Sequence, residues 1–381
     1  MSRPRAIVAG GGPVGLALAC ALPEFDVTVV EAGTPAAPAD ALDLRVYAIS
    51  PGTRELLRDL GAWDRLDASR LAPVRRMEIF GDAGARLAFS ARPSASLAWI
   101  VEAGRLAYAL EEQAASMPHV RLVRGRAAAF GAQASGSWLE IEGGERIEGD
   151  VLVGADGPDS RVRSSLGMAF VEEPYAEAAV VAHFGTAEEH GAIARQWFRD
   201  DGVLAWLPMP GKCISIVWSA PMAHADALVA MPPEELARTV REAGASTLGE
   251  MHTLSRVAKF ALRSIRVEQP VAEGVALIGD AAHAVHPLAG QGVNLGFQDA
   301  RALAEALAGR SALERPGDLR VLRRYARARR EDVTAMQFVT DSLDKLFASG
   351  TPGMRTFRNL GLRLVDSQDW AREALARQAM R

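Results

Sequence analysis

The feature that most constrains the fold is a glycine-rich turn between two strand-like runs near the N-terminus. "RAIVA" (5–9) is a short apolar run, "GGGPVG" (10–15) follows it, and "DVTVVE" (26–31) comes one helix length later. This strand–turn–helix–strand order predicts a βαβ unit, and therefore a parallel sheet with helices packed against it.

The glycines of this turn have the spacing of a dinucleotide-binding site. Gly10 permits a tight turn, Gly12 lets a pyrophosphate approach the backbone, and Gly15 lets the helix pack closely on the strand. Glu31 ends the second strand, where a carboxylate binds ribose hydroxyls. The pattern predicts dinucleotide binding, and it leaves NAD and FAD open.

Two further acidic turns follow buried strands. In "GADGPDSRVR" (154–163) a strand ends at Asp156 and Gly157, and the alternative is a structural turn in which the aspartate caps a helix. In "LIGDAAHAVHP" (277–287) a strand ends at Gly279 and Asp280, where a carboxylate can accept hydrogen bonds from a polyol such as the ribityl chain of a flavin.

The third acidic turn also contains two histidines, so a metal site has to be weighed. Asp280, His283 and His286 are three residues apart, a spacing at which side chains can converge. No further cluster of cysteine, histidine or aspartate completes a ligand shell, so we expect no metal and interpret the histidines as packing and hydrogen-bonding residues.

The segment "GQGVN" (290–294) precedes a helical pattern and favours a flavin. Its free N–H groups and the positive end of the helix dipole would stabilise negative charge. Reduced flavin carries its charge at N1 and the neighbouring carbonyl oxygen, so a helix N-terminus there would stabilise the reduced anion.

Together these motifs resemble those of the class A flavoprotein monooxygenases, the single-component FAD hydroxylases. The stretch from His286 to Asp299, with "DLRVYAIS" (43–50), "LPMPGKCISIVWSAP" (207–221) and "FRNLGLRLVD" (357–366), is similar to the ubiquinone-biosynthesis hydroxylases. The resemblance runs from about residue 5 to about residue 366. It implies an α/β fold, in which a Rossmann-like FAD-binding domain carries an inserted β-rich substrate domain and a C-terminal helical tail.

The resemblance also implies roles for individual residues. It places Gly10, Gly12, Gly15 and Glu31 on the ADP half of FAD, Arg45 near the flavin, Asp156 and Gly157 near the pyrophosphate, and Gly279 and Asp280 on the ribityl chain and pyrophosphate. Relatives often carry a polar residue where this chain has Ala103, and Arg105 is the candidate substitute. The residues expected to line the isoalloxazine ring are Pro287, Gly290, Gln291, Gly292, Val293 and Asn294.

The implied reaction is hydroxylation of an aromatic ring. Reduced FAD reacts with dioxygen at C4a, and the terminal oxygen of the hydroperoxide passes to the ring of a prenylated phenol or quinone precursor. The Pro287 carbonyl and the backbone amides of Gly290, Gln291 and Gly292 are the expected contacts to the peroxide. NAD(P)H and a ferredoxin-type reductant are both open as electron donors. No general base is identifiable, since His183, Arg195 and Tyr175 are equally compatible with packing or surface roles.

Other functions would use some of the same motifs. A flavin-dependent halogenase would carry a WxWxIP stretch and a catalytic lysine, and the stretch is absent here while Lys212, Lys259 and Lys345 are poorly placed. An NAD-dependent dehydrogenase would not explain the turn at Asp280 or the segment 290–294. A hydroxylase of another small aromatic substrate and a non-catalytic flavin-binding protein stay as alternatives.

The chain length suggests two joined domains rather than one core. We assign 1–70, 100–170 and 270–310 to the FAD-binding domain, 71–99 and 171–269 to the β-rich domain, and 311–381 to C-terminal helices; residues 99–117 are expected to be helical. The tail carries Leu343, Leu346 and Phe347 on one apolar face, and Met354, Phe357, Leu360, Leu364 and Val365 on another. We expect it to pack on its own domain, with the membrane surface or other ubiquinone-biosynthesis proteins as the alternative contact.

Charge and composition bear on partners and compartment. A net charge of −4 gives no basic field for nucleic acid. The N-terminal apolar stretch superficially resembles a secretory signal, but the glycine run and Pro13 interrupt it. Cys20 and Cys213 follow no metal or redox spacing. The sequence therefore predicts a cytoplasmic protein, with a location against the inner membrane face as the variant.

Overall fold

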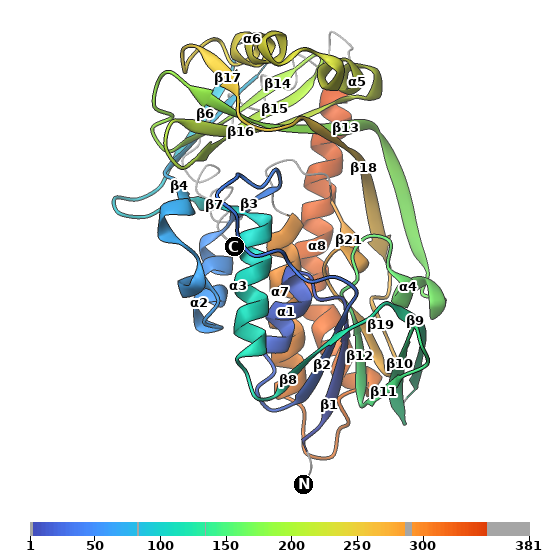
Figure 1. The fold of residues 1–381 in the computed structure, drawn as a ribbon. Coiled ribbons are helices and arrows are strands. Elements are labelled where there is room, and N and C mark those ends of the chain that lie inside the picture. Colours follow the sequence, from blue (N-terminus) through green and yellow to red (C-terminus); the bar gives the residue numbers. More distant parts are fainter. Residues whose placement is uncertain (1–2, 82–83, 134, 286–291, 349–381) are drawn as a thin grey trace.

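The molecule has a lower part built on a parallel sheet and an upper part built on a broad antiparallel sheet (Figure 1). The computed structural model describes residues 3–81, 84–133, 135–285 and 292–348, except for the side chains of 338–348. Helix α8 (Leu319–Ala348) runs alongside both parts. The α/β fold class predicted from the sequence is confirmed, whereas the domain boundaries stay predictions.

The lower part contains a six-stranded sheet in the order β19-β20-β12-β1-β2-β8. All neighbours from β20 to β8 are parallel, and β19 is the antiparallel edge strand. β1 and β12 are buried on both faces, which explains why they form unbroken apolar runs in the sequence. The strands are β1 (Arg5–Ala9), β2 (Asp26–Glu31), β8 (Val120–Arg124), β12 (Val151–Gly154), β19 (Val271–Ala272) and β20 (Val275–Leu277).

Alternate residues of this sheet pack on two different layers. Val8 and Val153 pack in a core that also contains residues of the helices α1 (Pro13–Cys20), α3 (Ala103–Ala115) and α7 (Gly292–Ala308). Ile7 and Leu152 point the other way, into a core shared with a three-stranded sheet. That sheet has the order β11-β10-β9 and consists of β9 (Ala127–Gln133), β10 (Gly136–Ile141) and β11 (Arg146–Gly149).

The upper part is a nine-stranded sheet with two unlike faces. Its main path is β21-β18-β13-β16-β15-β14-β5-β6, and β17 pairs with β13. Helices α5 (Met222–Ala230) and α6 (Pro233–Ala243) cover one face, where Val180 and Ala182 belong to their core. The strands are β5 (Arg76–Phe80), β6 (Arg86–Ser90), β13 (Phe170–Thr186), β14 (Ile193–Arg199), β15 (Gly202–Met209), β16 (Cys213–Pro221), β17 (Met251–Thr253), β18 (Ala258–Val267) and β21 (His283–Ala284).

A small sheet lies where the two parts meet. It has the order β3-β7-β4 and consists of β3 (Val46–Ile49), β4 (Ala72–Val74) and β7 (Ala98–Glu102). Ile100 of this sheet shares one hydrophobic cluster with Met209 and Cys213, which come from the second face of the large sheet. That face therefore looks toward the lower part of the molecule.

Two local expectations are corrected by the structure. Residues 99–102 belong to strand β7 rather than to a helix, because pairing with β3 and β4 outweighs the local helical pattern. The sequence pattern of residues 232–243 predicts a capped helix; helix α6 forms over Pro233–Ala243, but Pro232 provides no side-chain cap. Helices α7 and α8 confirm the helical pattern after Asn294, and the apolar tail residues from Leu343 to Val365 lie outside the described side chains.

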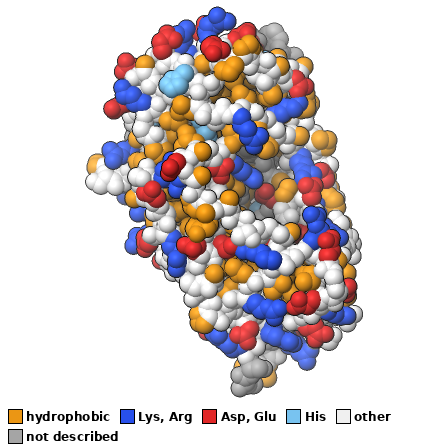
Figure 2. Space-filling view, viewed as in Figure 1, with side chains coloured by type: hydrophobic (Ala, Val, Ile, Leu, Met, Phe, Trp, Pro, Cys, Tyr) orange, Lys and Arg blue, Asp and Glu red, His pale blue; other side chains and the backbone are white. Residues whose placement is uncertain are grey.

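The remaining elements are short. They are α2 (Pro51–Asp59), α4 (Arg161–Ser165) and the 3-10 turns η1 (Trp63–Arg65), η2 (Ala68–Arg70) and η3 (Gly279–Ala281). Among the described residues, no helix combines the length and apolar character needed to cross a bilayer. On the face drawn in Figure 2, acidic and basic side chains are interspersed, so this face shows no basic field for nucleic acid.

Candidate functional site

The three glycines of the first turn differ in what a side chain at each position would meet. Gly10 has φ +107°, and a Cβ there would lie 2.3 Å from the Ala155 carbonyl oxygen. A Cβ on Gly15 would lie 2.1 Å from the Gly10 carbonyl oxygen, so glycine lets α1 pack on the turn. A Cβ on Gly12 would meet nothing within 4 Å. The fold itself therefore explains Gly10 and Gly15, whereas Gly12 leaves open space at the start of α1.

That open space suits a pyrophosphate. Gly12 is the N-cap of α1 and offers no side chain to the first turn of the helix. The N-terminus of a helix favours an anion because its N–H groups and its dipole point outward. The residues present therefore fit the phosphate groups of FAD.

Glu31 is held above the same turn by backbone hydrogen bonds. Its Oε2 accepts the N–H of Gly11 at 2.7 Å, and its Oε1 accepts the N–H of Gly33 at 3.2 Å. Each carboxylate oxygen has a second lone pair, so a ribose hydroxyl can still donate to it. The ribose contact itself stays a prediction.

Asp156 uses its carboxylate to build helix α4. Oδ1 accepts the Ser160 hydroxyl at 2.6 Å, and Oδ2 accepts the N–H groups of Arg161 at 2.7 Å and Val162 at 3.1 Å. The alternative role for this motif, a turn in which the aspartate caps a helix, is therefore present in the structure. A pyrophosphate contact from this turn, which stays a prediction, would have to come from the backbone near Gly157, where φ is +81° and a Cβ would meet nothing within 4 Å.

Asp280 differs from Asp156 because its carboxylate is unengaged. The residue is partly buried, and no hydrogen bond joins its carboxylate to another described residue. Burial raises the pKa of Asp280, and the positive charges of His283 and Arg45 oppose that rise. A partly buried carboxylate without donors is costly. Hydroxyl groups of a ribityl chain would supply the missing donors, so this residue also fits FAD.

Behind Asp280 lies a buried hub centred on Asp299. Its Oδ2 accepts the Gly279 N–H at 2.9 Å and lies 2.6 Å from Nε2 of His283, and its Oδ1 accepts Nε–H of Arg329 at 2.8 Å. His283 is thereby engaged in holding the turn. No group of three potential metal-binding side chains occurs among the described residues, and His286 lies outside them.

Arg45 lies close to Asp280, on the loop before β3. Its guanidinium carbon is 5.5 Å from the centre of the Tyr47 ring, and its charge opposes the rise that burial causes in the pKa of Asp280. Burial raises the pKa of Tyr47, and the charge of Arg45 opposes this rise. Arg45, Tyr47 and Asp280 therefore surround one space, consistent with the expected place of Arg45 beside the cofactor.

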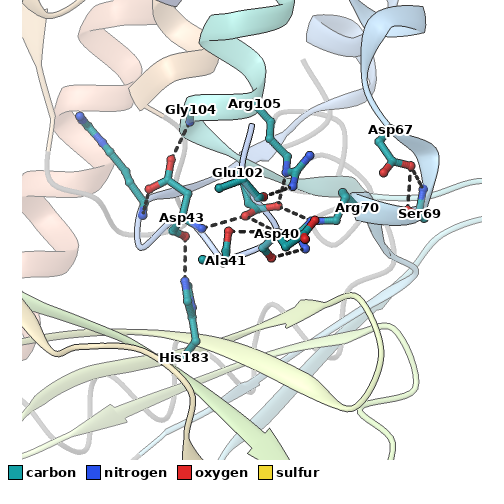
Figure 3. Close-up of polar contacts among 12 residues, drawn as sticks. Asp40, Ala41, Asp43, Asp67, Ser69, Arg70, Glu102, Gly104, Arg105 and His183 are labelled. Atoms are coloured by element: carbon teal, nitrogen blue, oxygen red, sulfur yellow. Dashed lines mark hydrogen bonds and ion pairs between the residues drawn. The ribbon is translucent and has the colours of Figure 1, made fainter. Parts of the chain in front are cut away.

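The same loop is anchored by Glu102, as Figure 3 shows. The buried carboxylate of Glu102 accepts a hydrogen bond from the Asp43 N–H at 2.8 Å. It accepts two more from Nε and Nη2 of Arg70, at 2.9 and 2.8 Å, and one from Nε of Arg105 at 3.0 Å. Burial acts to raise the pKa of Glu102, but the bonds from Arg70 and Asp43 lower it overall. Glu102 is therefore a charged hub that fixes the loop carrying Arg45.

Arg105 has a structural role in this hub. Besides Glu102, its Nη2 donates to the Ala39 carbonyl at 2.5 Å. That Arg105 also binds the cofactor, in place of the polar residue that relatives carry at the position of Ala103, stays a prediction.

Asn294 uses its side chain to hold the start of α7. Its Oδ1 accepts the Ser50 N–H at 3.0 Å, and its Nδ2 donates to the Ala48 carbonyl at 2.8 Å. Val293 packs against the core, and Gly292 leaves open space where a Cβ would stand. Any flavin contact in 292–294 would then come from the backbone or Val293. Pro287, Gly290 and Gln291 lie outside the described residues.

Comparison with solved structures identifies the fold. The chain superimposes with a TM-score of 0.78 on PqsL of P. aeruginosa in complex with 2-aminobenzoylacetate, at 23% identity, over 95% of this chain and 99% of that one. The p-nitrophenol 4-monooxygenase PnpA of Pseudomonas putida DLL-E4 gives a TM-score of 0.77 at 18% identity, over 98% of each chain.

Sequence comparison then decides the family. The FAD-binding domain family matches residues 4–340. The chain is 36% identical to the 3-demethoxyubiquinol 3-hydroxylase of Escherichia coli (strain K12), over 98% of this chain and 96% of that protein. It is 34% identical to the mitochondrial ubiquinone biosynthesis monooxygenase COQ6 of Xenopus tropicalis, over 95% and 90%. The chain belongs to the FAD-dependent hydroxylases of ubiquinone biosynthesis.

Sequence reasoning missed several residues that hold the site of this FAD-dependent monooxygenase together, among them Glu102, Arg329 and Arg163. Arg329 binds Asp299 from α8, and Arg163 joins two motifs because its buried guanidinium donates to the carbonyls of Ala281 at 2.9 Å and Pro158 at 2.8 Å. Arg163 lies within a motif and so could have been suspected. Arg329 is one of many arginines on an amphipathic helix, and nothing in its spacing marks it.

Proposed function

We propose that this monooxygenase hydroxylates the aromatic ring of a prenylated phenol or quinone precursor in ubiquinone biosynthesis. The observation that carries the proposal is the match over nearly the full length of both chains to the Escherichia coli 3-demethoxyubiquinol 3-hydroxylase. The alternative is another small aromatic substrate, which the fold alone would equally allow.

The described residues support a division of labour in which the protein binds and orients. Bound FAD, once reduced, supplies the activation of dioxygen. The turn at Gly12 and the carboxylates of Glu31 and Asp280 would hold the cofactor. The start of α7 would favour negative charge on the flavin, and the large sheet would exclude water from the ring.

The electron donor and the location are part of the proposal. We propose NAD(P)H as donor, with a ferredoxin-type reductant as the alternative. A prenyl chain has to leave the bilayer, so we further propose that the protein works at the inner membrane face, where contact with the membrane or with other proteins of the pathway would deliver the substrate.

A substrate comparison tests the proposal. The FAD-loaded protein is reduced and then given 2-prenylphenol or p-hydroxybenzoate under ¹⁸O₂. We expect one labelled oxygen atom in the product of the prenylated ring and little product from the small acid. Hydroxylation of p-hydroxybenzoate alone would overturn the substrate class and leave the flavin chemistry intact.

A further inference from the structure

The three residues of the upper sheet that the sequence offers as candidates for a general base lie in different places. Arg195 pairs in register with Trp206 and lies 3.5 Å from Oε2 of Glu78, so it is on the helix-covered face. Tyr175 lies between Pro174 and Ala178, where the β13–β18 register shifts. Neighbouring residues of a strand point to opposite faces of the sheet. Ala182 belongs to the helix-covered core, so His183 is on the face toward the lower part.

His183 is held in one tautomer by the loop that carries Arg45. Its Nε2 lies 2.8 Å from the Asp43 carbonyl oxygen, as Figure 3 shows. A carbonyl oxygen only accepts, so Nε2 carries the hydrogen. Burial lowers the pKa of His183, and the carboxylates of Asp43 and Glu102 are the charges that oppose this shift. The ring is therefore neutral at neutral pH, and its Nδ1 is a bare acceptor.

Nδ1 of His183 is buried and has no hydrogen-bond partner among the described residues, and the same holds for the hydroxyl of Ser215 on the neighbouring strand. His183 pairs in register with Ser215, which places the two side chains next to each other on the same face. Neither Nδ1 of His183 nor Oγ of Ser215 has a hydrogen-bond partner among the described residues, and both residues are fully buried. Buried polar groups are normally satisfied, so this pair calls for a missing O–H group.

The pair lies beside the hydrophobic cluster at which the two parts meet. Ser215 also pairs with Leu207, which packs on the hydrophobic cluster that joins the large sheet to Ile100 of the small sheet. The other buried unpartnered atoms include the indole nitrogens of Trp206 and Trp218, which belong to the helix-covered core. Among the buried unpartnered atoms of the described residues, only those of His183 and Ser215 combine an acceptor and a hydroxyl on register neighbours.

We propose that His183 and Ser215 bind the ring hydroxyl of the substrate. The phenol O–H donates to Nδ1 of His183, and its oxygen accepts from the Ser215 hydroxyl. This assignment rests on the proposed function, because it needs a phenolic substrate. It would fix the orientation of the ring and select a free hydroxyl over an alkylated one.

The test compares 2-prenylphenol with its methyl ether, which keeps the shape and loses the O–H donor. Binding to the oxidised FAD-loaded protein is measured by calorimetry. We expect the phenol to bind about tenfold more tightly than the ether, the size expected for one well-made hydrogen bond. His183→Gln keeps a donor for the Asp43 carbonyl and removes the acceptor, and Ser215→Ala removes the hydroxyl. Both should lose most of this preference while binding the ether as before.

Ser219→Ala is the matched control, because Ser219 is a buried serine on the same strand and face, four residues away. It should keep the tenfold preference, and all variants should retain FAD and their circular dichroism. Retention of the preference in both His183→Gln and Ser215→Ala would overturn the assignment and leave the pair as a site for buried water. In that case the proposed function would still stand, provided that the unaltered protein hydroxylates 2-prenylphenol. Failure of the unaltered protein to bind either ligand would instead overturn the substrate class and this assignment with it.

Discussion

Nε2 of His283 lies 2.6 Å from Oδ2 of Asp299, and both side chains are buried. Burial acts to lower the pKa of His283, but the charge of Asp299 and the hydrogen bond to it raise the pKa overall. Burial likewise acts to raise the pKa of Asp299, and His283 and Arg329 hold it below the ordinary value. The pair is therefore a buried ion pair that joins the turn at Gly279 to α7.

This pair predicts a pH dependence of stability. The folded pKa of His283 lies above its ordinary value of 6.5, so its contribution is complete below pH 6.5 and is lost as the pH rises through the folded pKa. We expect His283→Gln to lower the free energy of unfolding of the FAD-loaded protein by about 3–5 kcal/mol below pH 6.5. The difference from the unaltered protein should shrink at higher pH.

Chemical denaturation between about pH 6 and 9 measures this difference. His252→Gln is the control, because His252 is exposed and its replacement should change the free energy of unfolding little. A difference for His283→Gln that stays constant over the same range would show that His283 is not charged in the folded protein.

The first glycine turn predicts that two neighbouring substitutions act in opposite ways. Gly12→Val should leave the stability of the FAD-free protein unchanged and weaken FAD binding strongly, because its side chain enters space that no protein atom fills. Gly15→Ala should instead destabilise the FAD-free protein by about 1–3 kcal/mol, since its Cβ would lie 2.1 Å from the Gly10 carbonyl oxygen. Thermal melts and FAD titrations separate the two effects, and normal FAD affinity in Gly12→Val would contradict the assignment.

The two acidic turns predict a similar contrast. Asp280→Ala should weaken FAD binding by about 1.5–3 kcal/mol without destabilising the FAD-free protein, because its carboxylate makes no hydrogen bond to another described residue. Asp156→Ala should lower stability by about 1 kcal/mol or more, since it removes three hydrogen bonds that start α4. Unchanged FAD affinity in Asp280→Ala would show that the ribityl chain is held elsewhere.

We also predict that FAD is bound without a covalent bond. The described part of the site offers hydrogen-bond donors, carboxylates and open space beside Gly12. The two cysteines, Cys20 and Cys213, are buried. Heat denaturation should therefore release free FAD into the supernatant, as measured by chromatography and absorbance. Yellow colour that stays with the precipitated protein would contradict this.

The sequence predicted those parts of the site whose chemistry is local. The glycine turn, its two strands and Glu31 lie within 27 residues of one another. A Cβ would clash with the backbone at Gly10 and Gly15, whereas Gly12 leaves open space, as the spacing of the glycines predicts. The role of Asp156 could not be decided, because a carboxylate after a strand serves equally well as a helix cap and as a ligand contact.

The parts that could not be predicted depend on contacts between distant segments. Arg329 reaches Asp299 from another helix, and Glu102 binds Arg70 only because β7 and the turn at η2 come together in the fold. His183 became distinguishable from Arg195 only when strand pairing showed which face each occupies. Periodicity gives the alternation along a strand but does not say what covers each face.

The two-residue strand β21 pairs with β18, so the large sheet ends in the same turn that carries Asp280 and His283. Ile265 and Arg266 are thereby paired in register with Ala284 and His283, and the His283 side chain contacts Asp299 in the buried centre of the lower part. The rest of the upper sheet cannot separate from the cofactor-binding part without breaking the pairing of β18 with β21. We therefore expect the FAD-loaded protein to unfold in one cooperative transition, with coincident loss of flavin and of sheet structure, although chains of this size often unfold in stages.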